Sequence, residues 1–340
     1  MKNILLVFTG GTIGSSVAAH TINTSATAGY ELLAQYRRTD PAHDRIHFTT
    51  IQPLQLLSEN LQPRVWQTLI AAIEAQQPEQ FDGIIVTHGT DTLAYTAAAL
   101  SFYFAALERP ILLVSSDYPL TDARANGLAN FRCAVEFIRQ RIANGVFVPY
   151  RNPQQAQQVH RGTRLACSLQ LSGDFVSVQG KSFMGFDNGQ FTAFAEPPKP
   201  LPSAGSIRVT ARFSERVLMI KPYPGLNYAH INLAGVDAVI HDLYHSGTAC
   251  ATLEWGEGYS LLAFIDRCVQ HKLNIYLAPA IHSEDAYQST RALLDQGAHM
   301  LWNMSIEAAY VKLMLAYGNF SNSQQILDFM EVTLAHEHIL

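Results

Sequence analysis

Short apolar segments alternate with longer amphipathic segments along most of this chain, and the alternation limits the folds that it can adopt. Continuous apolar runs bounded by turn residues are typical of parallel strands that are buried on both faces. Such runs occur at Ile4–Phe8, Gly83–Thr87 and Ile111–Ser115, and helical patterns occur at Pro63–Ala75, Asp91–Ala106 and Asp122–Ala143. The pattern predicts an α/β fold with a doubly wound, mostly parallel sheet.

A different pattern appears at the end of this first region. Within residues 160–192 and just beyond, the segments Leu169–Gly173, Phe175–Gln179 and Gly189–Phe194 combine β-forming residues with glycines. Short strands separated by such turn signals predict hairpins. We expect them at the edge of the sheet.

The alternation resumes after a proline-rich segment. Ala195–Ser206 holds four prolines and has no periodicity, which is typical of an interdomain linker. We therefore expect a larger N-terminal domain over residues 1–194, a linker over 195–212 and a smaller parallel α/β domain over 213–340. In the last domain, strands are expected at Val217–Ile220, Ala238–Ile240, Asn274–Ala278 and His299–Trp302, and helices at Gly258–His271, Tyr287–Gln296, Ser305–Ala316 and Ser323–Ala335.

Charge and composition exclude several classes of protein. The 340 residues include 23 basic and 28 acidic side chains, for a net charge of −5, without a cluster of Lys and Arg. We expect no nucleic-acid partner, since such binding depends on neutralising phosphates. No apolar run reaches the ~18 residues of a membrane span, and Ile4–Phe8 is too short for a signal peptide. Four scattered cysteines favour reduced thiols, so we predict a cytoplasmic protein.

Only 15% of the residues are charged, against roughly 25% in soluble domains. A surface with so few charges is consistent with contact between subunits.

Two glycine-rich loops follow predicted parallel strands, at the sheet edge where α/β proteins bind ligands. They are Thr9–Gly14 (TGGTIG) and Thr87–Thr92 (THGTDT). Thr9 occupies the first glycine position of a dinucleotide fingerprint, and the chain has no GxxxxGK[ST] phosphate loop. Ser15–Gly29, which follows the first loop, lacks the helical period that a pyrophosphate site needs, and we interpret it as a mobile loop.

Hydroxyl, carboxylate and backbone N–H groups in these loops are the components of an acyl-transfer site. One hydroxyl would attack a carbonyl, a second group would relay a proton, and N–H groups would stabilise the oxyanion. The alternative from spacing alone is that the glycines only permit tight turns.

The same residues resemble the two signatures of bacterial-type L-asparaginases. Thr9–Gly14 is similar to the first signature, and the segment Gly83–Phe102, which contains His88–Thr92, is similar to the second together with its strand and helix. Pro110–Gly127, Tyr223–Gly225 and His245–Thr248 resemble further landmarks of the family, so that the resemblance covers essentially the whole chain.

The resemblance implies an ammonia-releasing amidohydrolase of cytoplasmic type that acts on asparagine, with glutamine as a further candidate substrate. Thr12 would be the nucleophile, Thr90 a second hydroxyl, and Asp91 the acid that holds the α-amino group of the substrate. Ser58 would bind the α-carboxylate, with Glu59 at a position where glutamine is common. The resemblance assigns three more residues to substrate binding, and these are Gly11, Gly89 and Ser116.

The family's other properties are also expectations here. The resemblance implies no metal or organic cofactor and a small amino-acid amide as the substrate. It implies a homodimer or homotetramer, in which Glu284 would contribute the acid that crosses to a neighbouring subunit's site.

Three positions depart from the family pattern. His160–Ser168 aligns with a segment that ends in a catalytic lysine, but Cys167 stands at the lysine position and Lys181 is the next lysine. Thr21 stands where the family has a loop tyrosine, the nearest tyrosine being Tyr30. Thr248 replaces an asparagine that reaches a neighbouring subunit.

Several of the residues singled out also have an ordinary structural interpretation. Cys167 can also be interpreted as a small buried hydrophobic residue. His88 can be interpreted as a group that orients the loop by hydrogen bonding, and Glu59 as a charge exposed to solvent. His336-Glu337-His338 is interpreted as a frayed, solvated chain end, because two histidines are too few ligands for zinc.

Three functions remain open from the sequence. The first is an asparaginase-like amidohydrolase. The second keeps the fold and nucleophile but acts on a different small amide. The third is an amino-acid-binding homologue with impaired catalysis, which the missing lysine motivates.

Overall fold

The computed structural model describes residues 1–11, 13, 15–18, 21–24, 28–194 and 208–339. The chain divides into two compact units, Met1–Pro200 and Leu201–Leu340. The sequence predicted the division at residues 195–212, of which 195–207 lie outside the described residues. That linker stays a prediction.

The first unit is built on an eight-stranded sheet with the order β10-β9-β8-β7-β6-β5-β1-β4. Strands β4, β1, β5, β6 and β7 pair in parallel, whereas β8, β9 and β10 continue the sheet in antiparallel fashion. This confirms the predicted mostly parallel sheet with an edge hairpin. The bounds are β1 Lys2–Val7, β4 Ile46–Ile51, β5 Gly83–Thr87, β6 Pro110–Val114, β7 Gly145–Tyr150, β8 Gln157–Arg161, β9 Met184–Asp187 and β10 Gln190–Ala193.

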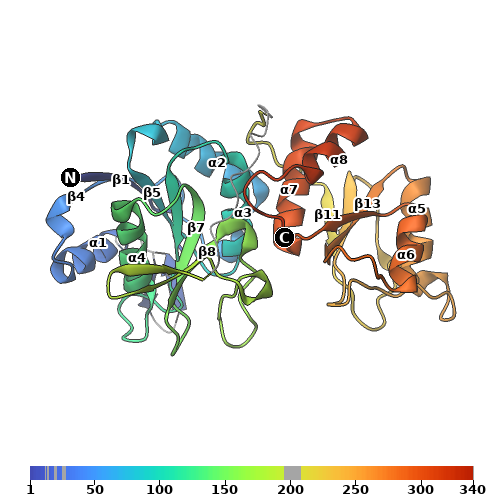
Figure 1. Ribbon diagram of the computed structural model, residues 1–340, viewed down its shortest axis with the longest axis horizontal. Helices are drawn as coiled ribbons and strands as arrows, with labels where there is room; N and C mark the ends of the chain where they lie inside the picture. Colours follow the sequence, from blue (N-terminus) through green and yellow to red (C-terminus); the bar gives the residue numbers. More distant parts are fainter. Residues whose placement is uncertain (12, 14, 19–20, 25–27, 195–207, 340) are drawn as a thin grey trace. The chain divides into compact units, whose positions relative to one another are not determined.

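Helices cover both faces of this sheet (Figure 1). They are α1 Ala28–Thr39, α2 Pro63–Glu74, α3 Leu93–Tyr103 and α4 Gly127–Gln140. Ile4 and Leu6 of β1 belong to the apolar core that α1 and α4 complete with Tyr36 and Phe131. Because side chains alternate along a strand, the fully buried Leu5 faces the opposite layer, where α2 and α3 pack together. Burial on both faces explains why the strands are continuously apolar.

Helix α4 begins later than the sequence predicted. The prediction placed its start at Asp122, but the helix begins at Gly127. The Asp117 carboxylate accepts a hydrogen bond from the Asn126 backbone N–H at 3.1 Å, and the Asn126 side chain accepts one from the Asp117 N–H at 3.0 Å. These bonds stabilise a loop in the preceding segment, so the first turn of the expected helix does not form.

Two of the three expected hairpin segments are also wrong. Gly189–Phe194 overlaps β10, but Leu169–Gly173 and Phe175–Gln179 form no strands, and the one bridge in this region joins Leu165 to Ser177. Leu171 and Gly173 have φ values of +68° and +74°, which interrupt the extended backbone of a strand.

The segment Ser15–Gly29 is partly regular, contrary to its interpretation as a loop. Strands β2, Ser15–Ala18, and β3, Thr21–Thr24, pair as an antiparallel hairpin, and α1 begins at Ala28. Residues 19–20 and 25–27 of this segment lie outside the described residues.

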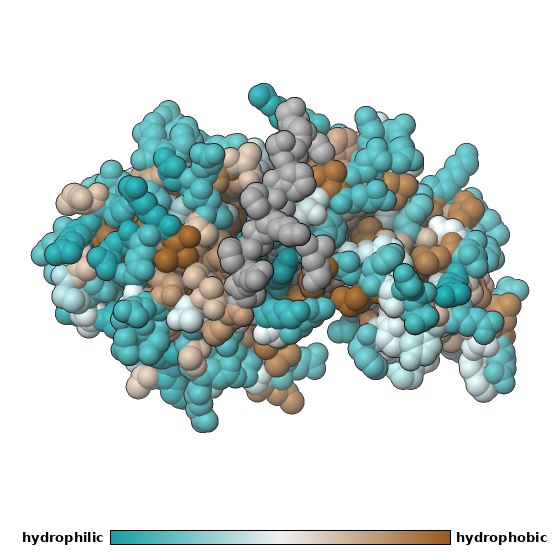
Figure 2. Space-filling view, viewed as in Figure 1, coloured by the Kyte–Doolittle hydropathy of each residue, from teal (hydrophilic) through white to brown (hydrophobic). Residues whose placement is uncertain are grey.

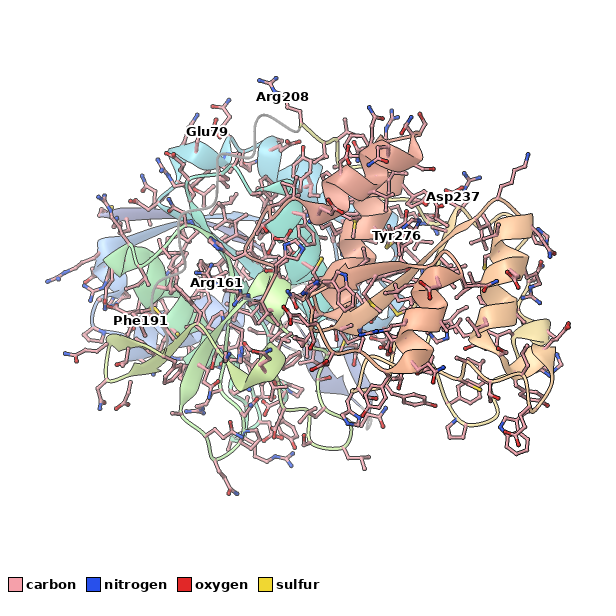
Figure 3. The ribbon with its side chains drawn as sticks, turned by 45° about the vertical axis from the view of Figure 1, so that its right-hand side comes forward. Glu79, Arg161, Phe191, Arg208, Asp237 and Tyr276 are labelled. Atoms are coloured by element: carbon pink, nitrogen blue, oxygen red, sulfur yellow. The ribbon has the colours of Figure 1, made fainter. Side chains whose placement is uncertain are left out.

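The second unit contains a four-stranded parallel sheet in the order β11-β12-β13-β14, as predicted. Helices α5 and α6 complete one apolar core, and α7 contacts β11, β13 and α8. Tyr276 of β13, labelled in Figure 3, is fully buried, and its hydroxyl lies 3.1 Å from that of Tyr317 of α7. The bounds are β11 Val217–Ile220, β12 Ala238–His241, α5 Leu261–Gln270, β13 Asn274–Ala280, α6 Gln288–Asp295, β14 His299–Trp302, α7 Ile306–Asn319 and α8 Ser323–Glu331.

The chain end is not frayed, and that interpretation of His336-Glu337-His338 is wrong. Glu337 is completely buried and lies 2.6 Å from the Nζ atom of Lys312 in α7, which is equally buried. Lys312 also donates to the carbonyl oxygens of Met330 and Val332, and Glu337 accepts from backbone N–H groups that include that of Leu334. The pair ties the C-terminal segment to α7.

Hydrophilic residues cover most of the face shown in Figure 2. Among the described residues, no helix is long and apolar enough to cross a membrane.

Removal of the buried ammonium should destabilise the second unit. We expect Lys312→Met to lower the free energy of unfolding by about 3–5 kcal/mol, because the Glu337 carboxylate then stays buried without its counter-ion. Adding Glu337→Gln should restore part of the loss, since the amide oxygen still accepts from Leu334 N–H. Chemical denaturation measures both.

The ion pair of the exposed Arg216 with the half-buried Asp237 provides the control, and Asp237 is labelled in Figure 3. Arg216→Met should cost no more than about 1 kcal/mol. If Lys312→Met costs as little as this control, the buried pair does not stabilise the fold as argued.

Candidate active site

Three loops meet at the carboxyl edge of the first sheet. They follow β1, β4 and β5, which are neighbours in the order β5-β1-β4, and parallel strands place their carboxyl ends at the same edge. The first loop begins at Thr9, the second contains Leu56 and Ser58, and the third runs from His88 to Thr92. The strand order therefore brings together loops that are far apart in sequence.

The glycines let these loops touch through their backbones. Gly11 N–H donates to the Leu56 carbonyl oxygen at 3.1 Å, and a Cβ atom on Gly10 would lie 2.4 Å from the same oxygen. A Cβ atom on Gly11 would lie 2.3 Å from the backbone nitrogen of Gly89. Gly10 and Gly11 also have φ values of +103° and +75°, which disfavour any side chain. Neither position accepts a larger residue.

Thr9 and Thr87 connect the first and third loops, in each case just before the glycines of that loop. Thr9 Oγ1 donates to the Thr87 carbonyl oxygen at 2.5 Å, and Thr9 N–H donates to Thr87 Oγ1 at 3.3 Å. Both side chains are buried. The sequence predicted no structural role for either hydroxyl. The only signal in the sequence was that both threonines immediately precede a predicted turn that contains glycine.

Ser58 links the second loop to the third. Its hydroxyl donates to Asp91 Oδ2 at 2.9 Å and accepts from Asp91 N–H at 3.2 Å, and Thr92 Oγ1 donates to the Ser58 carbonyl oxygen at 3.0 Å. Ser58 is buried, whereas Asp91 is exposed. A Cβ atom on Gly89 would lie 2.3 Å from Ser58 Oγ, so this glycine leaves space for the serine. These bonds hold the Asp91 carboxylate at a fixed position where it is exposed to solvent.

His88 precedes this part of the loop and is buried. Its Nδ1 atom lies 2.8 Å from the Gly89 carbonyl oxygen, which can only accept, so Nδ1 carries the proton. Burial lowers the pKa of His88, against smaller opposing effects of that hydrogen bond and of Asp91. His88 is therefore neutral near pH 7, which fits the loop-orienting role considered from the sequence.

The remaining residues proposed for this edge occupy different environments. Thr90 is half-buried next to Asp91, and Glu59 is exposed beside Ser58. Thr12 lies outside the described residues; of its neighbours in sequence, Gly11 and Ile13 are both buried. Trp66 and Leu69 of α2 help to line a residual cavity of only about 10 Å³ beside the loops.

Ser116 is engaged within its own loop. It is completely buried, and its hydroxyl donates to the Tyr118 carbonyl oxygen at 2.6 Å while accepting from Gly127 N–H at 3.2 Å. These bonds give Ser116 a structural role at the start of α4. Its assignment to substrate binding stays a prediction.

The segment His160–Ser168, which was expected to correspond to the family's lysine-bearing segment, is well anchored. Arg161, labelled in Figure 3, lies over the ring of Phe183 at 4.3 Å, and burial lowers its pKa to about 10. Gly162 packs against α3, where a Cβ atom would lie 2.6 Å from Ser101 Oγ. Cys167 is half-buried beyond this point, and the exposed Lys181 donates to Gln179 Oε1 at 2.9 Å.

Three further candidates lie elsewhere. Tyr30 is exposed in α1, and its ring is 6.5 Å from that of Phe8, which precedes the first loop. Thr248 and Glu284 belong to the second unit, where Thr248 Oγ1 lies 2.9 Å from Ser246 Oγ and Glu284 is exposed. Among the described residues, no group of three or more His, Cys, Asp or Glu side chains is placed to hold a metal ion.

Comparisons with known proteins agree with this arrangement. The family model described as Asparaginase, N-terminal matches residues 3–193, a range that includes all three loops. An L-asparaginase of Thermococcus kodakarensis is 28% identical over 349 residues, with 98% of each chain covered. The fold and the site define an amidohydrolase. The chain belongs to the asparaginase family.

Solved structures show the same architecture. The thermostable L-asparaginase from Thermococcus kodakarensis aligns over 99% of both chains with a TM-score of 0.81 and 25% identity. L-asparaginase I from Vibrio cholerae aligns over 100% of this chain and 99% of that one, with a TM-score of 0.78 and 25% identity. A second kind of relative is a glutamyl-tRNA(Gln) amidotransferase component of Methanosphaera stadtmanae, which is 27% identical over 99% of this chain and 76% of that protein.

The Thr9–Thr87 link can be tested directly. We expect Thr9→Val to lower the free energy of unfolding by about 1–3 kcal/mol, because a buried carbonyl oxygen loses its hydrogen-bond donor. Thr9→Ser keeps the hydroxyl and is the matched control. Thermal or chemical denaturation measures the difference, and equal stability of the two variants would contradict the role of the hydroxyl.

The contact between Gly89 and Ser58 gives a second test. Gly89→Ala should reduce amide hydrolysis at least ~10-fold, because the new methyl group displaces Ser58 and with it the Asp91 carboxylate. Ammonia release measures the rate, and circular dichroism confirms the fold. An alanine variant with the activity of the original protein would show that the loops tolerate separation.

Proposed function

We propose that the protein hydrolyses the side-chain amide of L-asparagine, and also that of glutamine, releasing ammonia through a threonine nucleophile. The observation that carries this proposal is the backbone contact between Gly11 and Gly89. Each of these glycines directly precedes a threonine, Thr12 or Thr90, that the family resemblance assigns to catalysis. The same contact lies beside Ser58, which holds Asp91.

Substrate recognition follows from the charges of an amino acid. The exposed Asp91 carboxylate is suited to bind the α-ammonium group, and a charge-assisted hydrogen bond of this type is stronger than a neutral one. In this proposal Ser58, Gly11 and Gly89 border the α-carboxylate, and the Ser58 hydroxyl, which donates to Asp91 Oδ2 at 2.9 Å, would turn from that oxygen to the substrate. In this proposal Glu59 is a second acid at the rim of the site.

The reaction would proceed through an acyl-enzyme. The Thr12 hydroxyl attacks the amide carbonyl carbon, and its proton passes to the departing nitrogen, which leaves as ammonia. Water then attacks the resulting ester, restores the hydroxyl and releases aspartate. Thr90 is proposed as the second hydroxyl in proton transfer, where Cys167 has taken the place of the family's lysine.

We also propose a cytoplasmic homodimer or homotetramer. The low content of charged residues supports extensive contact between subunits. Glu284 and Thr248 of the second unit would then act at a neighbouring subunit's site.

A second candidate function comes from the amidotransferase relatives. One relative is named as part of an amidotransferase, and it matches 99% of this chain. The specific alternative is therefore that the protein supplies ammonia to a partner protein. Hydrolysis of a different small amide and amino-acid binding without turnover are also candidates, and the cysteine at the lysine position is the motivation for both.

Turnover by the purified protein separates these functions. Ammonia release from free asparagine without any partner supports the first proposal. Turnover only of different ω-amides or N-acyl amino acids supports the changed substrate. Saturable binding of aspartate without turnover supports the non-catalytic homologue, and activity that requires a partner supports the amidotransferase role.

Replacement of the nucleophile should abolish the reaction. We expect Thr12→Ala to lower kcat at least ~10³-fold, because no hydroxyl remains to form the acyl-enzyme. Thr12→Ser keeps a hydroxyl and should retain measurable turnover. Coupled ammonia detection measures both variants. If the alanine variant kept about a tenth of the original rate, Thr12 would not be the nucleophile.

The role of Asp91 can be isolated with a matched substrate. Asp91→Asn keeps an oxygen that accepts from Ser58 but removes the charge. We expect KM for asparagine to rise about 10-fold or more, because the α-ammonium group loses its counter-ion. Succinamate lacks the α-amino group, so its KM should change little. Equal changes for the two substrates would contradict this role.

A further inference from the structure

The carboxyl edge of the second sheet holds a pocket that none of the proposed catalytic groups occupies. Its volume is about 380 Å³, within the range of small-ligand sites. Pro222–Leu226, which follow β11, line one part, and Tyr244 and Cys250, which follow β12, line another. Ligands of open α/β sheets bind at this edge of the strands.

Five aromatic side chains dominate the lining, and these are Tyr223, Tyr228, Tyr244, Trp255 and Tyr259. Tyr223 is 58% exposed and Trp255 67% exposed, so large aromatic surfaces remain open to solvent. None of the described residues that line the pocket is charged. The pocket therefore presents aromatic faces without a fixed ionic partner.

Tight turns fix the backbone of the segments that carry these rings. Tyr223–Leu226 is a turn closed by a hydrogen bond from Leu226 N–H to the Tyr223 carbonyl oxygen at 3.0 Å, with Gly225 at φ +88°. Leu253–Gly256 is a second turn, closed at 2.9 Å, and carries Trp255. A bond from Leu261 N–H to the Cys250 carbonyl oxygen at 2.8 Å closes the whole loop before α5.

The Tyr228 hydroxyl donates its proton to His241. His241 Nδ1 lies against the Asp242 carbonyl oxygen, which only accepts, so the proton is on Nδ1. His241 Nε2 is then an acceptor, and the Tyr228 hydroxyl donates to it at 2.8 Å. Tyr228 is only 3% exposed and its ring stacks on that of Phe264, so it forms a fixed wall of the pocket and has no proton to donate to a ligand.

Charged residues of both signs lie in the segments around the pocket. Asp242 follows β12, and Glu254 and Glu257 flank Trp255 in sequence, whereas Lys221 precedes Pro222. The Arg267 guanidinium also donates to the Tyr228 carbonyl oxygen at 2.8 Å, so the preference for a cation rests on the aromatic faces. Aromatic faces attract cations, with Trp and Tyr among the best partners.

We propose that this aromatic pocket binds a small organic cation of the quaternary or tertiary ammonium class. The rings would surround the alkylated nitrogen, whose methyl groups suit an apolar wall. None of the residues that line this pocket is assigned to amide hydrolysis, although Thr248, which is proposed to act at a neighbouring subunit's site, lies in the same loop between Tyr244 and Cys250. The proposal itself does not require that hydrolysis takes place.

Choline and its neutral isostere 3,3-dimethyl-1-butanol form the decisive pair of probes. Isothermal calorimetry on the full chain should show saturable binding of choline and at least ~2-fold weaker binding of the alcohol, since only the charge differs. Protection of the exposed Cys250 thiol from alkylation provides a second readout, with Cys250→Ser to assign the signal.

Ring variants test the walls of the pocket. Trp255→Leu and Tyr259→Leu should each weaken choline binding about 2- to 30-fold, whereas Tyr259→Phe, which keeps the ring, should stay within about 2-fold. Both Trp255 and Tyr259 are exposed, so the fold should tolerate the changes, and circular dichroism checks this.

Several results would overturn the proposal. They are absence of choline binding, equal or tighter binding of the neutral alcohol, and unchanged binding by both leucine variants. Dissociation of an oligomer by Trp255→Leu, with Cys250 already protected in the absence of choline, would assign the pocket to a subunit interface instead. Ammonia release from asparagine, measured in parallel, reports separately on the proposed catalysis.

Discussion

The site depends on one steric constraint, the direct contact between the backbones of Gly11 and Gly89. A Cβ atom on Gly11 would lie 2.3 Å from the Gly89 nitrogen, closer than side-chain carbons approach a backbone. Gly89 in turn leaves the space that Ser58 occupies. The three loops therefore approach one another so closely that only glycine, which has no side-chain carbon, fits at the contact. The polar groups beside the contact are brought together as a consequence.

The sheet makes this contact possible by its strand order. β1 lies between β5 and β4, so the loop after β1 touches both neighbours. Thr9 and Thr87 join the first and third loops before the glycines, and Ser58 joins the second loop to the third through Asp91. Asp91 is held by a neighbouring loop and not by its own turn alone, and its position therefore depends on three strands. A carboxylate placed at a helix N-terminus or in a single turn would be positioned less precisely.

Much of this could be predicted from the sequence because its signals are local. β5 and β11 were predicted with the correct bounds, since each is a continuous apolar run bounded by other residues. The glycine loops were recognisable for the same reason. What failed depended on distant partners or on competing side chains. Asp117 and Asn126 delay α4, and Lys312 buries Glu337, which is 25 residues further along the chain.

The candidate site shows the same limit. Spacing placed Thr90 and Asp91 at the sheet edge, but the bond between Ser58 and Asp91 spans 33 residues, and that between Thr9 and Thr87 spans 78. No local pattern predicts such bonds, because serine and threonine hydroxyls are also common in turns that they do not bridge.

The two sheets of this chain also show how one architecture serves different chemistry. Each presents loops at the carboxyl edge of parallel strands. In the first unit, glycines remove side chains so that backbones, hydroxyls and a carboxylate converge. In the second unit, Tyr223, Trp255 and Tyr259 place aromatic rings at the equivalent edge, and the proton of Tyr228 is donated to His241. The fold supplies the edge in both cases, but the side chains in the loops determine whether it favours a polar amide or an alkylated cation.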